Sequence, residues 1–172
     1  MLENSKVILF DNPLLSEATP NFDFSNPPVD PVELSNTLIK IMTEFNALGV
    51  AANQCGLPYR AFALWSNPSM VCFNPKIVDT SSETISLEEG CLSFPGVLVK
   101  IKRPSIIKVR YAEPNGNIVT KKLIGITARA FQHELDHLDG IEYFKRAGTY
   151  HYEKAKKNIR LARRKFAKVA TQ

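Results

Sequence analysis

Two of the three histidines in this chain, His133 and His137, stand four residues apart, and Glu134 directly follows the first. On an α-helix, residues four apart are neighbours on one face, so the two imidazoles can bind one metal ion. The glutamate can then act as a general base toward a water at that metal. The same H-E-x-x-H pattern also occurs on solvated helix faces without a metal. The motif alone therefore leaves both interpretations open.

The residues around this motif carry a helical pattern. Apolar side chains recur at spacings of three and four, at Ile124, Ala128, Phe131, Leu135 and Leu138. This period predicts an amphipathic helix that begins near Gly125 and is ended by Gly140, because glycine commonly terminates helices. The two histidines fall beside the apolar face, on a flank that can face a sheet.

The rest of the chain shows signals for further helices and strands. The sequence Asp-Pro-Val-Glu at 30–33 is typical of a helix N-terminus, and an apolar stripe follows it to about residue 46. Runs rich in β-branched or aromatic residues predict strands at 61–65, 70–73, 76–78, 97–101, 106–111 and 118–123. A hairpin turn is predicted at 114–117. Residues 1–28 contain four prolines and are expected to be extended or loop.

The order of these elements predicts a fold of the α+β class. We expect one catalytic domain over residues 1–172, in which short, mostly antiparallel strands pack around a central metal-binding helix. An N-terminal helix and a basic C-terminal helix complete the domain. The C-terminal helix lies within 148–172 and spans about 150–169, and its apolar side carries Ile159, Ala162, Phe166 and Val169.

Composition restricts the class of protein. The chain is 44% hydrophobic and 23% charged, as in ordinary globular proteins. No run approaches the roughly 18 apolar residues of a membrane span, and the first residues lack the features of a secretory signal or transit peptide. Three cysteines, Cys55, Cys72 and Cys91, cannot all pair, which is typical of a reducing compartment. We expect a cytoplasmic monomer without membrane contact, in a bacterial cell or in a host cell if the gene is viral.

Charge is distributed unevenly along the chain. Residues 145–172 contain ten Lys and Arg and one acid, a net charge of +9. Because the whole chain carries +5, the other 144 residues sum to −4. This asymmetry indicates that the tail, rather than the whole fold, meets an anionic partner.

Several residues could supply a third metal ligand. One protease class has a third histidine six residues after the second, but this chain has Tyr143 there, which argues against a site of that class. A downstream glutamate, as in thermolysin-like enzymes, would be Glu142 or Glu153, and the remaining histidine is His151. Upstream, Cys91 follows a glycine and precedes a Phe-Pro-Gly turn. As a thiolate it would complete a Cys-His-His set with one open position, although cysteine also occurs widely as a small buried hydrophobe.

Three segments resemble the signature motifs of one enzyme family. They are G-V-A-A-N-Q at 49–54, E-G-C-L-S at 89–93 and Q-H-E-L-D-H at 132–137. In this order and at these separations they are similar to the three motifs of the peptide deformylases. The resemblance runs from about Leu48 to Gly140. One departure is Ala47, where the family usually has another glycine. The alanine side chain would reduce the space in which a substrate can approach the backbone.

The resemblance implies a specific reaction. Peptide deformylases remove the N-formyl group from the N-terminal formylmethionine of newly made polypeptides and release formate. The resemblance implies a metal held by Cys91, His133 and His137. The metal is Fe²⁺ in the family, although this donor set also suits Zn²⁺, Ni²⁺ and Co²⁺. Glu134 would take a proton from the attacking water and pass it to the departing amine.

The resemblance also implies which residues meet the substrate. The Gln54 side-chain amide and the backbone N–H of Leu92 would stabilise the oxyanion. Arg129 would line a methionine pocket with its stem while its head reaches water. In the family Glu89 lines the site, and our own hypothesis is that it pairs with Arg103 and supports the loop that carries Cys91. The implied substrate-binding residues are Leu48, Gly49, Glu89, Ile126, Arg129 and Ala130.

Other functions remain open for the tail and for the motif. The basic helix would either be a solvated cap of the fold or contact ribosomal RNA, as a C-terminal helix does in some relatives. A zinc metallopeptidase of the H-E-x-x-H kind is the alternative enzyme, and a metal site without Cys91 would be its structural mark. A third hypothesis is an RNA-associated protein with a degenerate site. The complete set of Gln54, Cys91, His133, Glu134 and His137 argues against it.

Overall fold

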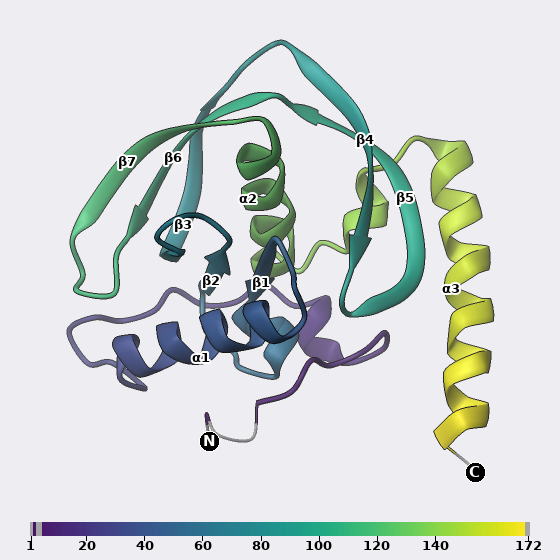
Figure 1. Cartoon of the computed structure of the whole chain (residues 1–172), viewed down its shortest axis with the longest axis horizontal. Helices are drawn as coiled ribbons and strands as arrows, with labels where there is room; N and C mark the ends of the chain where they lie inside the picture. Colours follow the sequence, from purple (N-terminus) through teal and green to yellow (C-terminus); the bar gives the residue numbers. More distant parts are fainter. Residues whose placement is uncertain (1, 3–4, 171–172) are drawn as a thin grey trace.

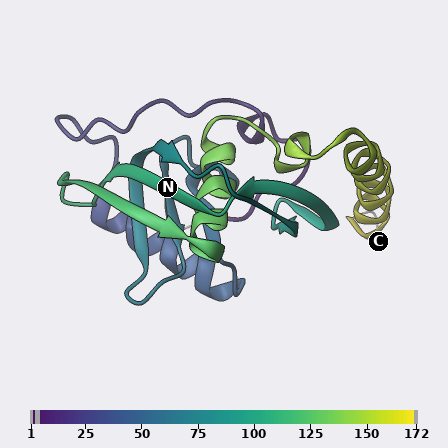
Figure 2. The same cartoon turned by 90° about the horizontal axis from the view of Figure 1, so that it is seen from above.

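The helix α2 (Gly125–Leu138) lies at the centre of the molecule, with strands on either side (Figure 1 and Figure 2). The computed structural model describes residue 2 and residues 5–170, with the backbone alone for 167–170. The predicted α+β class is confirmed. Among the described residues, no helix has the length and apolar character needed to cross a membrane.

The chain reaches the first strand through a loop region and helix α1 (Pro31–Glu44), both as predicted. The loop contains the short 3-10 turn η2 (Pro13–Leu15). Asp30 caps α1, since its side chain accepts hydrogen bonds from the backbone N–H groups of Val32 and Glu33. The apolar stripe of α1 packs against the first two strands and is buried at Leu34, Leu38 and Ile41.

A twisted antiparallel sheet forms one wall around α2. Within the described residues its order is β1 (Gly49–Ala51), β2 (Ala61–Leu64), β3 (Met70–Thr80), β6 (Ile106–Ala112) and β7 (Ile118–Ile124). The strands predicted at 70–73 and 76–78 are a single strand. Asn74, with φ of 48°, lies at a register shift in its pairing with β6. Strand β1 was not predicted, because three residues are too few to show a period.

The predicted turn at 114–117 joins β6 to β7, with the Gly116 N–H donating to the Glu113 carbonyl at 2.8 Å. Between β1 and β2 the chain forms the short 3-10 helix η3 (Ala52–Cys55), which carries Gln54. This segment follows β1 directly, so the Gly49–Gln54 motif is split between a strand and a turn.

A two-stranded sheet forms the other wall. Strands β4 (Thr84–Cys91) and β5 (Phe94–Pro104) pair as an arched hairpin, which Figure 1 shows to the right of α2. Alternate residues of β5 are buried, including Val97, Val99 and Ile101, whereas most of β4 is exposed. Strand β4 was not predicted, because its Glu-Glu-Gly sequence at 88–90 has low strand propensity.

Helix α2 is buried around nearly its whole circumference. On one side Phe131 packs edge-to-face on Phe62 of the large sheet, with 5.0 Å between ring centroids. The opposite flank faces the β4–β5 hairpin, so His133, Glu134 and His137 are buried as well. Buried polar side chains need hydrogen-bond partners or ligands, and this group is therefore the first place to look for a site.

The C-terminal helix lies at the edge of the molecule. The 3-10 turn η4 (Tyr143–Arg146) leads from α2 to α3 (Thr149–Ala170), which runs beside β5 (Figure 1). Ala155 and Ile159 are buried in a cluster with residues of β5. Phe166 is 44% exposed, with its ring 5.6 Å from that of Phe10. The side chain of Val169, expected on the same side, lies outside the described residues.

The structure predicts a large stability effect at Gly140. Its φ is 68°, and a Cβ there would lie 2.7 Å from the backbone carbonyl carbon of Glu17. A left-handed conformation costs a non-glycine residue about 1–2 kcal/mol, and a packed backbone segment cannot move aside as a side chain can. We expect Gly140→Ala to lower the free energy of unfolding in urea by about 2 kcal/mol or more. Gly148→Ala is the matched control, because its Cβ would meet nothing within 4 Å. Equal effects of the two substitutions would contradict this account.

Candidate metal centre

Three side chains from strand β4 and helix α2 lie close together where the hairpin meets the helix. Cys91 is the last residue of β4, while His133 and His137 lie one turn apart on α2. One ligand atom from each lies within 4.8 Å of the others, and Cys91 Sγ is 3.2 Å from His137 Nε2. A thiolate and two imidazoles with room for a further ligand fit a divalent transition-metal ion.

The ring of His133 is oriented by a carboxylate. Its Nδ1 lies 3.0 Å from Glu89 Oε2 and donates to it, which leaves Nε2 for a metal. Arg103 binds both oxygens of Glu89, with Nε–Oε1 at 2.7 Å and Nη2–Oε2 at 2.9 Å. The predicted pairing of Glu89 with Arg103 is therefore confirmed.

The charge state of Glu89 follows from these contacts. Burial by itself raises the pKa of a carboxyl, but the hydrogen bonds from His133 and Arg103 and their positive charges outweigh it. They lower the pKa of Glu89 to about 2. Burial likewise opposes protonation of His133, yet its hydrogen bonds to Cys91 and Glu89 raise the pKa of its imidazole above the usual range. A metal at Nε2 therefore competes with a proton.

His137 occupies a different environment. Burial, followed by the charge of His133, lowers the pKa of His137 well below its usual value. This favours the neutral ring that binds metals. Its Nδ1 is buried without a hydrogen-bond partner among the described residues. Its backbone carbonyl accepts from the Asn53 side chain at 2.6 Å, so η3 is tied to the end of α2.

Glu134 points toward strand β1. A Cβ on Gly49 would lie 2.7 Å from Glu134 Oε1, so the carboxylate occupies the space that the missing side chain leaves. Its Oε2 is buried without a hydrogen-bond partner among the described residues. Burial raises the pKa of Glu134 to about 7, and the opposing charge of His133 only partly offsets it.

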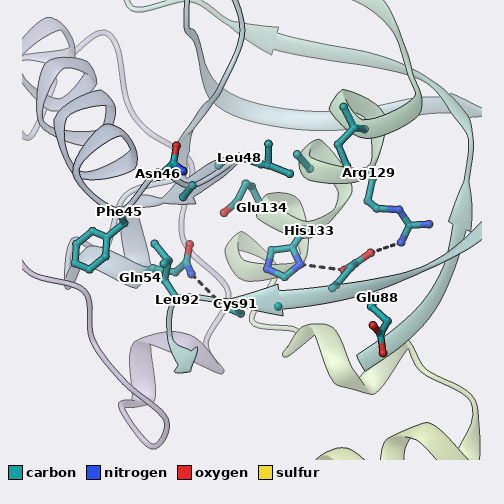
Figure 3. A pocket seen from close by; sticks show the side chains of 16 residues that line it. Phe45, Asn46, Leu48, Gln54, Glu88, Cys91, Leu92, Arg129, His133 and Glu134 are labelled. Carbon is teal, nitrogen blue, oxygen red and sulfur yellow. Dashed lines mark hydrogen bonds and ion pairs between the residues drawn. The ribbon is translucent and has the colours of Figure 1, made fainter. Parts of the chain in front are cut away.

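Gln54 presents its amide N–H₂ to the site. Its Oε1 accepts from the backbone N–H of Ala51 at 2.9 Å, which fixes the amide orientation. Its Nε2 then lies 3.2 Å from Cys91 Sγ and 3.4 Å from Ser93 Oγ. The arrangement places a neutral donor beside the candidate ligands (Figure 3).

A cavity of about 370 Å³ opens beside these groups (Figure 3). The expected substrate-binding residues all line it, as do Gln54, Cys91, Leu92, His133 and Glu134. Leu48 and Ile126 are half exposed at its walls, whereas Ala130 is buried. Phe45, Asn46 and Glu88 also line the cavity and were not predicted, because they stand outside the recognised motifs.

The prediction for the head of Arg129 is wrong. Its side chain is 8% exposed, and its guanidinium binds Glu89 and the carbonyls of Ile85 and Ile101 instead of water. Because the hairpin closes over this flank of α2, acceptors from β4 and β5 surround the head. Arg129 thus connects α2 to both strands while lining the cavity.

The residues at the other positions considered for a third ligand make other contacts. Tyr143 is buried with its ring 5.2 Å from that of His133, and its hydroxyl donates to the Val97 carbonyl at 2.7 Å. Glu142 pairs with Lys145 at 2.8 Å and Glu153 with Lys156 at 3.3 Å, and neither belongs to the group of close ligand atoms. Of these alternatives the structure brings Cys91 to the histidines, which argues against a metallopeptidase site without it.

Comparison with known proteins agrees with this geometry. A family model described as polypeptide deformylase matches residues 5–152.

The chain belongs to the polypeptide deformylase family.

The similarity to individual deformylases extends over most of the chain. It is 38% identical over 138 residues to the peptide deformylase of Thermotoga neapolitana, a match that covers 79% of this chain and 82% of that protein. A plant peptide deformylase structure has a TM-score of 0.87 at 25% identity and covers 98% of this chain and 94% of its own. A Plasmodium falciparum peptide deformylase structure has a TM-score of 0.78 at 33% identity. This match covers 92% of this chain and 99% of the Plasmodium chain. The protein is therefore a metal-dependent hydrolase that removes the formyl group from N-terminal methionine.

The contact between Glu89 and Arg103 predicts strong energetic coupling. Removing either partner takes one counter-charge from the other in a buried site, although Arg129 still binds Glu89 and Asp136 still binds Arg103. Loss of one partner of a buried ion pair typically costs about 3–5 kcal/mol. In a double-mutant cycle of Glu89→Gln and Arg103→Met, we expect a coupling of about 1–3 kcal/mol in the free energy of unfolding. Urea denaturation of metal-free protein measures it. Purely additive effects would show that the pair does not act as a unit.

Proposed function

We propose that Glu134 is the general base of the deformylation reaction, and that Gln54 and the backbone N–H of Leu92 stabilise the oxyanion. The observation that carries this proposal is the placement of Glu134. Its carboxylate is buried beside the candidate ligand His133 and lines the cavity with one oxygen unpaired among the described residues (Figure 3). A buried carboxylate oxygen without a hydrogen-bond partner does not stabilise the fold, and it is free to accept a proton during the reaction.

We assign Cys91, His133 and His137 as the metal ligands, with Fe²⁺ as the native ion. The donor set admits Fe²⁺, Zn²⁺, Ni²⁺ and Co²⁺, and the choice of Fe²⁺ rests on the family resemblance. An ion bound there supplies Lewis acidity, which lowers the pKa of the attacking water and polarises the formyl oxygen.

A protein side chain then transfers one proton from the water to the leaving amine. Water adds to the formyl carbon and the C–N bond breaks, giving a free amine and formic acid, which ionises to formate. Glu134 takes a proton from the water and returns it to the amine nitrogen. With a pKa raised to about 7 by burial, its carboxyl can both accept and release a proton near neutral pH.

Attack by water places negative charge on the formyl oxygen. The Gln54 amide is locked with its N–H₂ toward the site by the bond from Ala51 N–H to Oε1. A donor held in advance needs no reorganisation when the charge develops, and loss of one such donor typically costs about 10²–10³ in rate. A glutamate at this position would keep the shape but present an acceptor and a negative charge.

The cavity walls fit an apolar side chain next to the formyl group. Leu48, Ile126 and Ala130 provide apolar surface, and the stem of Arg129 adds to it. The polypeptide beyond methionine would extend along β1 at Gly49 through backbone hydrogen bonds, which tolerate many sequences. Glu89 contributes by accepting hydrogen bonds from His133 and Arg129, which fix the positions of these two side chains.

We assign the whole chain, residues 1–172, to one catalytic domain that acts as a cytoplasmic monomer. The basic face of α3 would contact ribosomal RNA and hold the enzyme near nascent formyl-Met chains. In support, Ala155 and Ile159 pack on the body while Lys157, Arg160 and Arg164 are exposed. This leaves the cations available to phosphates.

The first test is release of formate from a formyl-Met tripeptide by Fe²⁺-loaded protein prepared without oxygen. We expect Glu134→Ala to lower kcat by about 10²–10⁴ while metal content stays unchanged. Oxygen must be excluded because it can oxidise the Cys91 thiolate. Glu44→Ala removes an exposed acid of α1 and serves as the control.

One outcome would contradict the assignment of Glu134, and another would contradict the reaction. Full activity of metal-loaded Glu134→Ala would remove it as the base. Cleavage of peptide bonds without formate release would instead support the metallopeptidase alternative.

A second test concerns α3. Replacing Lys157, Arg160 and Arg164 by Gln should weaken ribosome binding and lower its salt dependence by about one unit of log–log slope for each lost phosphate contact. Turnover of a free tripeptide should not change. The control replaces Lys76, Lys108 and Lys122, exposed cations of the large sheet, by Gln. Equal weakening by both sets would argue against a specific role of α3.

A further inference from the structure

Asp136 follows His133 by three residues on α2, and each of its carboxylate oxygens is bound by a different arginine. Oδ2 accepts from Arg103 Nη1 at 2.8 Å. Oδ1 accepts from Arg146 twice, from Nε at 3.0 Å and from Nη2 at 2.7 Å. Arg103 also holds the carboxylate of Glu89, and Glu89 orients His133. The charged contacts therefore form one continuous chain from the ligand to Arg146.

The members of this chain differ in burial. The side chains of Glu89, Arg103 and Asp136 are 5–6% exposed, whereas that of Arg146 is 47% exposed. The buried members cannot obtain replacement hydrogen bonds from bulk water without local opening. Arg146 thus supplies, from the surface, the last pair of donors that the buried network requires.

Arg146 lies in a turn that also contacts His133 through a second residue. It is the last residue of η4, the turn between α2 and α3 (Figure 1). Tyr143, at the start of the same turn, places its ring against His133. One short segment therefore contacts the ligand directly through Tyr143 and indirectly through the arginine.

We propose that Arg146 is a positioning residue for His133, acting through Asp136. With Arg146 in place both oxygens of Asp136 are satisfied, so Arg103 keeps two of its N–H groups on Glu89. Without Arg146, Oδ1 of Asp136 lacks donors and competes with Glu89 for the same guanidinium. The His133 ring then loses its fixed orientation. This inference rests on the proposed role of His133 as a metal ligand.

The test measures metal binding rather than turnover. Changes in residues that orient metal ligands typically cost about 10–100-fold in affinity, and Arg146 acts one contact further out. We expect Arg146→Met to raise the Kd for Co²⁺, followed by visible absorption, by about 10-fold. In the loaded enzyme kcat should fall while KM for a formyl-Met peptide stays unchanged. Arg146→Lys keeps the charge but cannot donate two hydrogen bonds in the same geometry. Its Kd for Co²⁺ should lie between those of the unsubstituted protein and of Arg146→Met.

Two controls separate positioning from general effects. Lys145→Met removes the neighbouring positive charge, which pairs with Glu142, and should leave the Kd unchanged. In an Asp136→Asn background, Arg146→Met should add little further loss, because the contact through which it acts is already altered. Urea denaturation of the same samples reports stability independently of metal binding.

An unchanged Co²⁺ Kd in Arg146→Met would overturn the proposal, even if the protein were less stable. Equal weakening by Lys145→Met would overturn it as well. If Arg146→Met does not fold, Arg146→Lys takes its place, and an unchanged Kd in that variant is decisive against the link. Failure of the unsubstituted protein to bind Co²⁺ would instead overturn the ligand assignment, and this inference with it.

Discussion

The site depends on one buried carboxylate, that of Glu89 on strand β4. Burying an ion is costly unless its oxygens are fully paired, and here two arginines and a histidine surround it. The same contacts that offset this cost also orient His133 and hold the hairpin against α2. A negative charge that the fold keeps ionised thus serves both packing and metal binding.

The second constraint is the enclosure of α2 between two sheets. A helix with several polar residues on its inner flank is stable in this position only if each finds a partner. His133 finds Glu89, and Asp136 finds two arginines. Two atoms of α2 are exceptions, Glu134 Oε2 and His137 Nδ1, which are buried without a partner among the described residues. The first belongs to the residue proposed to move a proton, and the second to a proposed metal ligand.

Small residues decide how closely the walls approach. Gly49 has no Cβ, and its place is taken by the carboxylate of Glu134. Any larger residue there would push the proposed base away from the cavity. At the far end, Asn53 binds the His137 carbonyl and so joins η3 to the same helix. The strand motif and the helix motif are therefore parts of one packing arrangement.

The sequence by itself determined much of this protein. Local signals suffice for α1 and α2, because capping residues and apolar periods act within a few residues. The spacing of His133 and His137 on one helix face belongs to the same class of signal, and the motif order pointed to Cys91 and Gln54. Tertiary structure decided the rest. Strand β4 forms only by pairing with β5, and the head of Arg129 is buried only because that hairpin closes over it. The roles of Asp136, Tyr143 and Arg146 around His133 are likewise products of contacts between distant segments, and such contacts leave no periodic trace in the chain.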